Sequence, residues 1–435
     1  MIAMMKHSTR IIIAAMLFMM LGYQPTARAS SATAELVERG RYLAIAADCI
    51  ACHTAVGGVA YAGGRPLETP FGAIYSRNLT PDRETGLGLW SGDDFYRALH
   101  KGLSKDGSHL YPAFPYTYFT RISREDTTAI KAYLDTLTPI NNVIPPNRLP
   151  WLLRLRGLMA VWNLLFFREG GVEQPATRNS AALANQVLNE QVNEDRGAYL
   201  VETLGHCGAC HTPKNFLGAD KIKAALQGGE IQNWFAPNDT GDQRSGLGNW
   251  SDVDIVEYLQ TGRNAYALAT GPMAEVVENS TSKLNEADLQ AIANYLKHLP
   301  AAGLDATVAH PDPRAMTAGE AIFIDVCAGC HQISGEGSPR AFAPLKGSAI
   351  VQSQNPLNVI RLILQGARAS TTAARPTPFT MPAFNWKLND SQVAAVVTYI
   401  RNAWGNVAPP VTPAQVAALH SKFAQEPVAD HCCQN

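Results

Sequence analysis

Three copies of the motif Cys-x-x-Cys-His occur in this chain of 435 residues, and they constrain its fold more than any other feature. The copies are Cys49, Cys52 and His53; Cys207, Cys210 and His211; and Cys327, Cys330 and His331. Two thiols one helical turn apart can add to the two vinyl groups on one edge of a haem, and the adjacent imidazole then lies beneath the iron as its proximal ligand. The porphyrin is rigid, so both sulfurs and the nitrogen must converge on one face. The sequence therefore predicts three covalently bound haem c groups.

Other uses of paired cysteines fit this chain less well. A structural zinc ion needs four ligands, whereas each motif offers three and lies far from the next. A thioredoxin-like redox pair occurs near a βαβ pattern, and none is visible in the sequence. Six of the eight cysteines are thus assigned to haem. The remaining pair, Cys432 and Cys433, is compatible with free thiols, an intermolecular disulfide or a lipid attachment.

An internal repeat surrounds the three motifs. Each copy begins with a short helix that contains a glycine, namely Gly40, Gly197 or Gly319. Each copy ends with a segment whose apolar residues recur at helical spacing. These final helices are predicted at 123–137, 285–299 and 389–404, with Ser123, Asn285 and Asn389 as N-caps. The glycine should let an aromatic residue of the final helix approach the backbone of the first helix.

That helix crossing resembles the core of the class I cytochrome c fold. The predicted fold class is therefore all-α, with three tandem domains of this type, each wrapped round one haem. The length of the chain also suits about three domains. The predicted boundaries are 1–29 for a signal peptide, 30–138 for domain one, 139–192 for a linker with an apolar segment at 149–167, 193–302 for domain two, 303–313 for a second linker, 314–406 for domain three and 407–435 for a flexible tail.

A methionine sulfur is a common sixth ligand of a high-potential haem iron. Met273 and Met381 each follow a haem histidine, lie beside a proline and precede a final helix. We therefore expect them to be axial ligands in domains two and three, opposite His211 and His331. The proximal ligand in domain one is His53.

Domain one departs from this pattern. Phe114 stands nearly as far after His53 as Met273 stands after His211, and Tyr111 takes that place if the Tyr-Pro-Ala-Phe run is aligned with Met-Pro-Ala-Phe. Neither residue offers sulfur. The sixth ligand of haem one stays open between water, His100, His109 and no ligand at all, because Met159 is the only methionine between His53 and domain two and lies in the linker. We expect haem one to differ in spin state and to have a lower potential.

The N-terminus indicates export from the cytoplasm. Lys6 and Arg10 precede an apolar run at 11–21. Ala27 and Ala29 follow the run in an Ala-x-Ala arrangement. This pattern is typical of a cleaved secretory signal, with an uncleaved anchor as the alternative. The mature chain should begin near residue 30 in the periplasm. The net charge of −1 gives no basic footprint for nucleic acid.

At this level of detail the chain resembles the triheme cytochrome c subunits of membrane-bound bacterial dehydrogenases. These accompany catalytic subunits that oxidise gluconate, alcohols, sorbitol, fructose or aldehydes. The resemblance covers nearly the whole mature chain and is carried by the stretches 111–116, 162–166, 197–202, 204–215 and 271–277. Many members carry Met where Phe114 stands, and others, more often those paired with molybdenum dehydrogenases, carry Phe.

The resemblance implies an electron relay. A catalytic subunit with flavin, pyrroloquinoline quinone or molybdopterin would pass electrons through the haems to ubiquinone, at the outer face of the cytoplasmic membrane. Whether a small third subunit joins them is left open. The sequence contains no dinucleotide-binding, serine-hydrolase or zinc-protease motif, so we expect no catalytic residue on this chain.

Three alternatives remain at this point. The segment 149–167, flanked by Arg148 and Arg168, suits a helix lying in the membrane interface, a packed linker that bridges domains, or a docking surface for the catalytic subunit. An open haem-one site would also suit a stand-alone multihaem enzyme of the peroxidase or thiosulfate-oxidising kind. A soluble electron shuttle to a terminal oxidase is the third alternative.

Overall fold

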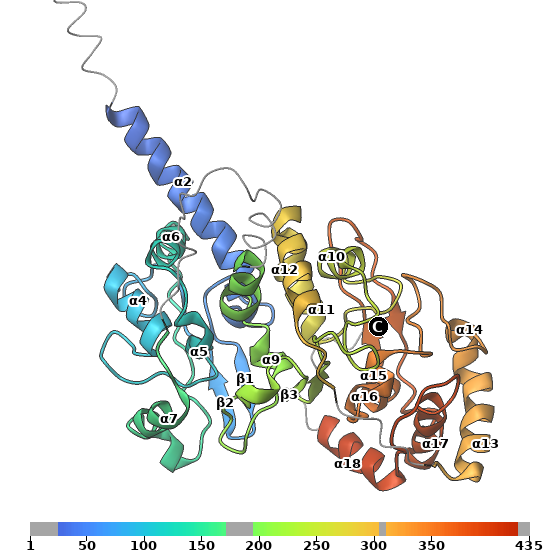
Figure 1. Cartoon of the computed structure of the whole chain (residues 1–435). Helices are drawn as coiled ribbons and strands as arrows, with labels where there is room; N and C mark the ends of the chain where they lie inside the picture. Colours follow the sequence, from blue (N-terminus) through green and yellow to red (C-terminus); the bar gives the residue numbers. More distant parts are fainter. Residues whose placement is uncertain (1–24, 171–194, 304–309, 425–435) are drawn as a thin grey trace, which may run out of the picture.

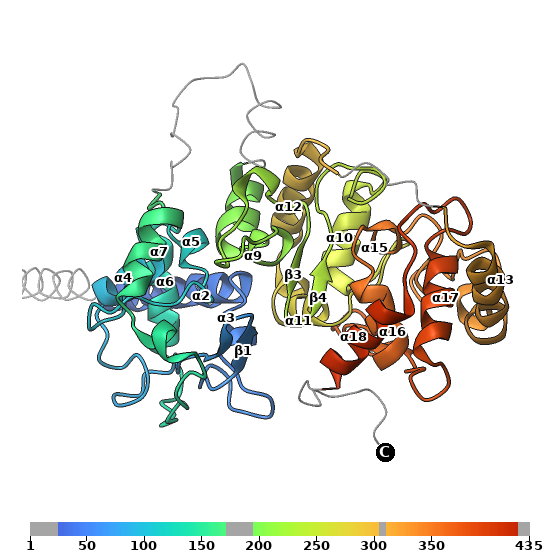
Figure 2. The same ribbon diagram turned by 90° about the horizontal axis from the view of Figure 1, so that it is seen from below.

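The computed structural model describes residues 25–170, 195–303 and 310–424, which we call the first, second and third segments (Figure 1). Each segment contains one Cys-x-x-Cys-His motif. The three lie in a row in chain order in both views (Figures 1 and 2). Residues 1–24 of the predicted signal peptide (1–29) and the pair Cys432 and Cys433 lie outside the described residues, whereas residues 25–29 belong to helix α2 (Pro25–Ala46).

Helices dominate all three segments, but the all-α prediction missed a short β-hairpin in each. The hairpins are antiparallel and pair β1 (Pro66–Thr69) with β2 (Gly72–Tyr75), β3 (Gly229–Ile231) with β4 (Trp234–Ala236), and β5 (Ala367–Arg368) with β6 (Thr380–Met381). Strands of two to four residues are too short to give a readable alternation of apolar and polar residues. They matter nonetheless, because β2 and β4 end one or two residues before the carbonyl groups that orient two of the motif histidines.

The first segment is built from two crossing helices. Helix α2 (Pro25–Ala46) leads into α3 (Cys49–Cys52), and α6 (Arg124–Leu134) packs across α2. In the sequence, α4 (Gly92–Lys101) and α5 (Tyr116–Phe119) lie between α3 and α6. The predicted linker contributes η1 (Trp151–Arg154) and α7 (Leu158–Phe166), which pack beside this segment.

The second segment repeats this order. A helix at 195–199 continues into the π-turn η2 (Leu200–Leu204) and the motif helix α9 (Gly208–His211). Then follow η3 (Ile222–Ala224), α10 (Asp252–Thr261), α11 (Pro272–Asn279), η4 (Thr281–Lys283) and the final helix α12 (Glu286–His298).

The third segment has the same first and final helices, but the elements between them differ. Helix α13 (Pro313–Ile322), the π-turn η5 (Phe323–Cys327) and α14 (Ala328–His331) carry the motif. After α15 (Ala349–Gln352) and α16 (Leu357–Gln365), helix α17 (Asp390–Ile400) packs across α13.

Glycine makes the helix crossing in every segment, as the sequence predicted. A Cβ atom on Gly40 would lie 1.8 Å from the backbone oxygen of Ala129. The corresponding distances are 2.1 Å from Gly197 to Ala291 and 2.3 Å from Gly319 to Ala395. Any side chain at these positions would force the two helices apart. The predicted N-caps are also confirmed, because the side chains of Ser123, Asn285 and Asn389 each accept a backbone N–H three residues on.

The first two segments are joined by a reciprocal pair of hydrogen bonds. The hydroxyl of Tyr42 donates to Asp288 Oδ2 at 2.6 Å, and the hydroxyl of Tyr199 donates to Asp126 Oδ2 at 2.6 Å. Each aspartate also receives an arginine from its own segment, Arg39 on Asp126 and Arg196 on Asp288. Equivalent residues therefore exchange the same contact across a pseudo-two-fold interface.

The third segment cannot form this contact, and it packs by another route. Its equivalents of the arginine, tyrosine and aspartate are Ala318, Ala321 and Gln392. One hydrophobic core spans the first two segments, whereas the third has a core of its own. The third segment is held to the second by hydrogen bonds such as those from Arg244 to the carbonyl of Val407 and from Asn358 to the carbonyl of Phe235.

The tail differs from the prediction. Residues 407–435 were expected to be flexible, but Pro413–Phe423 forms helix α18 with a capping box at Thr412. Val416 and Phe423 are buried, and α18 packs against α16 and α17. The helix is stable because its apolar residues complete the core of the third segment.

Among the described helices, none has both the length and the apolar character that crossing a membrane requires.

The reciprocal interface gives the first testable prediction. Burial and the Asp288 carboxylate raise the pKa of Tyr42, so the phenol stays protonated and donates. Replacing Tyr42 and Tyr199 by Phe leaves two buried carboxylates short of a donor, and each change should cost about 1–3 kcal/mol. Guanidinium unfolding of the haem-loaded protein measures this loss. Tyr266→Phe, a partly exposed tyrosine stacked on Trp250, is the matched control. Equal unfolding midpoints for the double variant and the control would contradict the prediction.

Candidate functional site

Each pair of motif cysteines lies on one short turn of helix. Cys49 and Cys52 are the two ends of α3. Cys207 immediately precedes α9, which contains Cys210, and Cys327 immediately precedes α14, which contains Cys330. Side chains three residues apart on a helix share a face. The structure therefore brings both thiols of each motif to the same side of the chain, as thioether attachment to one porphyrin edge requires.

The three motif histidines are oriented in the same way. The Nδ1 atom of His53 lies 2.6 Å from the carbonyl oxygen of Arg77. The equivalent distances are 2.8 Å from His211 to Pro237 and 2.9 Å from His331 to Ala343. A carbonyl only accepts, so Nδ1 must carry the hydrogen, and Nε2 is left with the lone pair that a metal takes. This tautomer and this anchoring fit a haem iron.

The motif thiols lie in buried surroundings. Burial raises the pKa of Cys49 and of Cys207 to about 12, and that of Cys327 to about 11. Within 25–170, 195–303 and 310–424, no three or more His, Cys, Asp or Glu side chains are grouped so as to hold a metal ion. The zinc interpretation therefore has no geometric support.

The second histidine has an additional partner that the sequence analysis missed. Asp239 Oδ2 lies 2.8 Å from His211 Nδ1. Burial lowers the pKa of His211, but the carboxylate of Asp239 and the Pro237 carbonyl outweigh it, and the pKa is raised. For His53 and His331 burial dominates and the pKa is lowered. Aligning 77–80 with 237–240 would have revealed an acidic residue in the second repeat only.

The two candidate methionines lie at the ends of regular elements. Met273 is the second residue of α11, after Gly271 and Pro272, and Met381 ends the hairpin strand β6. Both side chains are half-buried. Helix α11 also packs against α3, so the element that carries Met273 contacts the attachment turn of the first motif. An ion pair from Arg65 to Glu275, 2.8 Å long, reinforces this contact.

In the first segment, aromatic residues occupy the place of the methionine. Phe114 is half-buried, with its ring centroid 5.6 Å from that of Phe119, and it packs on the core shared with the second segment. The hydroxyl of Tyr111 donates to the carbonyl of Leu153 at 2.8 Å, and Arg156 lies over its ring. Both side chains thus have structural contacts.

The two histidines considered for haem one are also engaged. His100 Nε2 lies 2.6 Å from the carbonyl oxygen of Ile122, and its ring stacks on Tyr96. His109 Nδ1 lies 3.3 Å from the amide nitrogen of Asn163, whose oxygen accepts from the Tyr116 hydroxyl. An amide donor on Nδ1 places the imidazole hydrogen on Nε2, which is the wrong tautomer for a ligand through that atom.

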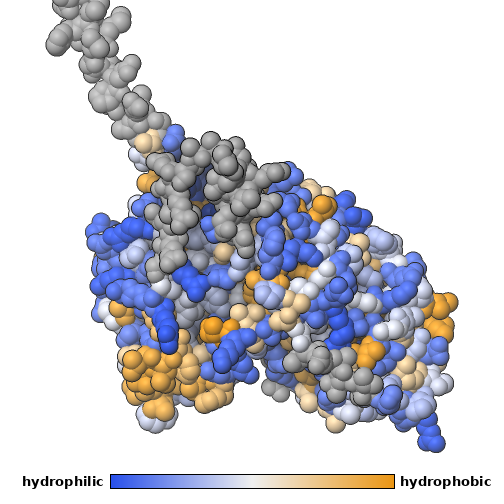
Figure 3. Space-filling model, in the orientation of Figure 1, coloured by the Kyte–Doolittle hydropathy of each residue, from blue (hydrophilic) through white to orange (hydrophobic). Residues whose placement is uncertain are grey.

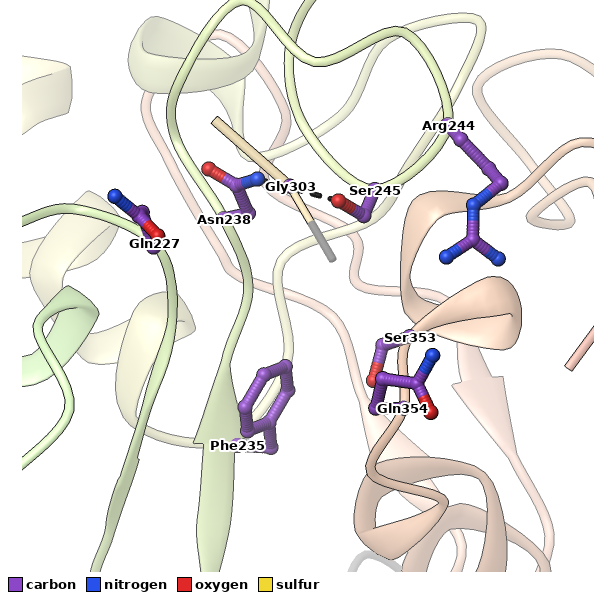
Figure 4. A pocket seen from close by; sticks show the side chains of 8 residues that line it. All are labelled: Gln227, Phe235, Asn238, Arg244, Ser245, Gly303, Ser353 and Gln354. Carbon is purple, nitrogen blue, oxygen red and sulfur yellow. Dashed lines mark hydrogen bonds between the residues drawn. The ribbon is translucent and has the colours of Figure 1, made fainter. Parts of the chain in front are cut away.

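A small polar pocket lies where the second and third segments meet (Figure 4). It has a volume of about 70 Å³ and is lined by Gln227, Phe235, Asn238, Arg244, Ser245, Gly303, Ser353 and Gln354. Asn238 Nδ2 donates to Ser245 Oγ at 3.2 Å across it. Sites for small molecules usually measure roughly 300–1,000 Å³. We therefore regard this pocket as part of the packing between segments.

Comparison with known proteins supplies the family. A family model described as cytochrome c matches residues 37–138 and 316–404. The chain is 41% identical over 407 residues to the gluconate 2-dehydrogenase cytochrome c subunit of Pantoea cypripedii, covering 88% of this chain and 89% of that protein. It is 36% identical over 441 residues to the cytochrome c subunit of the alcohol dehydrogenase (quinone) of Gluconacetobacter polyoxogenes, covering 97% and 92%. It is also 37% identical over 432 residues to the fructose dehydrogenase cytochrome subunit of Gluconobacter japonicus, covering 92% of this chain and 86% of that protein.

The candidate methionines give the second prediction. Met273→Leu and Met381→Leu keep the volume but remove the sulfur, so each should convert about one third of the iron from its low-spin state and lower one potential. Electron paramagnetic resonance and the long-wavelength sulfur–iron absorption measure the change. Met159→Leu is the control, because Met159 is a buried methionine of α7. A spectrum unchanged by Met273→Leu would remove this residue from the ligand set.

Proposed function

The chain belongs to the family of cytochrome c subunits of bacterial dehydrogenases, and we propose that it is the electron-relay subunit of a periplasmic dehydrogenase complex. Three tandem cytochrome c domains each carry one covalent haem c. The electrons come from a separate catalytic subunit and leave to ubiquinone at the outer face of the cytoplasmic membrane. The relatives that the chain matches over most of its length are cytochrome subunits of gluconate, alcohol and fructose dehydrogenases, which supports this proposal.

The motif geometry supports the proposed haem sites. Attachment is through the pairs Cys49 and Cys52, Cys207 and Cys210, and Cys327 and Cys330, with His53, His211 and His331 as proximal ligands. The observation that carries this assignment is the common anchoring of the three imidazoles through Nδ1. Met273 and Met381 are the sixth ligands in domains two and three. When bound, each haem supplies one-electron chemistry, and this chain holds the ligands, excludes water and sets the potentials.

The packing between the first two segments supports electron exchange between the proposed first and second sites. Helix α11, which carries Met273, lies against the attachment turn α3 of the first motif. From the other side, the Tyr118 hydroxyl bonds Asp220, and a Cβ on Gly208 would lie 2.8 Å from the same hydroxyl oxygen. Each attachment turn therefore contacts the neighbouring domain. This close packing supports a direct electron step between domains one and two.

Haem one is the unusual member of the relay. Phe114 and Tyr111 offer no sulfur, and the contacts of His100 and His109 hold both rings in structural roles. We expect a haem without a strong sixth protein ligand, with a lower potential than a His/Met haem. A haem without a sixth protein ligand would also support the stand-alone enzyme. The reactivity of the reduced protein with carbon monoxide therefore has to be measured together with its turnover in the absence of a partner.

An apolar surface surrounds α7, and we propose that it rests on the membrane. Its exposed residues are Trp151, Leu152, Leu155, Val161, Leu164 and Leu165, joined by Phe216 and Leu217 of the second segment. Leu164 is 84% exposed and Phe216 86% exposed. The indole of Trp162 donates to the carbonyl of Leu217, which binds the two parts together. Figure 3 shows an orange apolar area in its lower left, where Figure 1 places α7.

The composition of this α7 surface suits a membrane interface. Arginines at 148, 154, 156 and 168 accompany the leucines and tryptophans. Such a mixture allows apolar side chains to enter the acyl boundary while guanidinium groups meet anionic headgroups. Contact with the membrane would bring the relay close to ubiquinone. The quinone named for the Gluconacetobacter relative supports this acceptor.

The third prediction tests the relay itself. A tagged chain should recover a large dehydrogenase in equal amount from detergent-solubilised membranes, with its substrate class named by dye-linked and quinone-linked activity on sugars, alcohols and aldehydes. Cys207→Ala with Cys210→Ala should preserve dye-linked oxidation at the catalytic subunit but abolish quinone reduction, because the chain of haems is interrupted. Recovery of a soluble chain alone, with a carbon-monoxide-reactive haem and independent turnover, would overturn the subunit proposal.

The fourth prediction tests the α7 surface. Leu164→Gln with Leu165→Gln removes two exposed apolar side chains, and binding to vesicles with anionic lipid should weaken by about tenfold or more, corresponding to roughly 1.4 kcal/mol. The matched control is Ile333→Gln with Trp386→Gln, two exposed apolar residues of the third segment. Vesicle flotation measures binding, and pull-down measures the complex. Unchanged flotation with loss of the catalytic subunit would show that the surface docks a protein instead.

A further inference from the structure

The proximal histidine of the second motif has a carboxylate partner that the other two lack. His211 Nδ1 lies 2.8 Å from Pro237 O and 2.8 Å from Asp239 Oδ2. Both side chains are largely hidden from solvent, 14% exposed for His211 and 15% for Asp239. A hydrogen on Nδ1 is therefore shared between a neutral carbonyl and a negative charge.

Backbone geometry identifies the residues that replace Asp239 in the other segments. Leu79, Asp239 and Leu345 each follow, by two residues, the carbonyl that anchors the motif histidine. The backbone N–H of each also donates, at 2.8 Å, to the carbonyl of a residue with positive φ, respectively Tyr61, Leu226 and Gly335. The three positions are thus equivalent, and two of them are leucine.

A carboxylate beside Nδ1 changes how strongly the imidazole donates electron density to a metal at Nε2. The negative charge attracts the Nδ1 hydrogen and raises the electron density on Nε2, which makes the ring a stronger donor. The effect is larger in a site with little water, where charge interactions are less screened. A stronger donor favours the oxidised iron, which carries one more positive charge than the reduced iron.

We propose that Asp239 is a positioning residue that acts through His211 to lower the reduction potential of the second haem below that of the third. This inference rests on the proposed function, because it requires a haem iron on Nε2 of His211. Domains two and three otherwise have the same predicted ligand pair, histidine and methionine. Asp239 is the group that distinguishes them, since its equivalent in domain three is Leu345.

The redox step that this residue influences is a one-electron reduction. An electron enters the oxidised haem from the preceding donor, the iron changes from the ferric to the ferrous state, and no bond in the protein is formed or broken. Asp239 stabilises the ferric state, so the electron passes on from haem two more readily than from a site with leucine.

The fifth prediction is a potentiometric one. In the haem-loaded protein, Asp239→Leu and Asp239→Asn should raise the potential of one haem component only, by on the order of a tenfold change in its one-electron equilibrium, or about 59 mV. Asp239→Glu should stay close to the wild type, because it keeps the charge. The control is Glu230→Gln, which removes an exposed charge from the same segment as Asp239. Glu230 accepts a hydrogen bond from Asn355 of the third segment. The asparagine variant preserves shape if the leucine variant fails to fold.

A reciprocal variant gives an independent check. Leu79→Asp places a carboxylate at the equivalent position beside His53 and should lower the potential of haem one while leaving the other two unchanged. Mass spectrometry counts the covalent haems in every variant. Absence of haem from the second motif in the wild type would contradict the proposed function. Three haems with potentials unaffected by Asp239→Leu and Asp239→Asn would overturn this inference alone.

Discussion

Each motif depends on a single hydrogen bond between the histidine Nδ1 and a backbone carbonyl. The carbonyl comes from a residue 24 positions later in the first segment, 26 in the second and 12 in the third. This bond selects the tautomer, directs Nε2 toward the iron and ties the attachment turn to a distant loop. The hairpins β1–β2 and β3–β4 end just before the acceptor residues, so these short sheets place the carbonyl groups. The bond therefore links the attachment turn to that loop.

The three repeats are not equivalent partners. In the first two, Tyr42 donates a hydrogen bond to Asp288 and Tyr199 donates one to Asp126. These two repeats also share one hydrophobic core. The third has two alanines and a glutamine in place of the arginine, tyrosine and aspartate, builds its own core and adds α18 to it. In the proposed relay, domains one and two form a pair whose attachment turns contact the opposite domain. Domain three is attached to domain two by hydrogen bonds such as that from Arg244 to the carbonyl of Val407, and Phe235 of domain two packs on the core of domain three.

The repeats also differ at positions close to the predicted iron ligands. Phe114 stands in the first repeat where a methionine is predicted in the others, Asp239 adds a charge beside the imidazole in the second, and the third has neither change. Both residues lie in loops, whereas the first and final helices of each repeat share a glycine at the crossing and a polar N-cap on the final helix. One scaffold can in this way give three haems with different potentials, because the potential responds to ligand identity and to nearby charge.

The amino-acid sequence by itself determined the attachment motifs, the glycine crossings and the final helices, because each depends on spacing within a few turns of chain or on a repeated pattern. It also showed that Phe114 breaks the methionine pattern. The tertiary structure decided which carbonyl anchors each histidine, that Asp239 reaches His211, and that Pro413–Phe423 forms a helix and not a flexible tail. These features depend on contacts between residues far apart in the chain. No local periodicity or spacing records such contacts, since they exist only once the loops have closed.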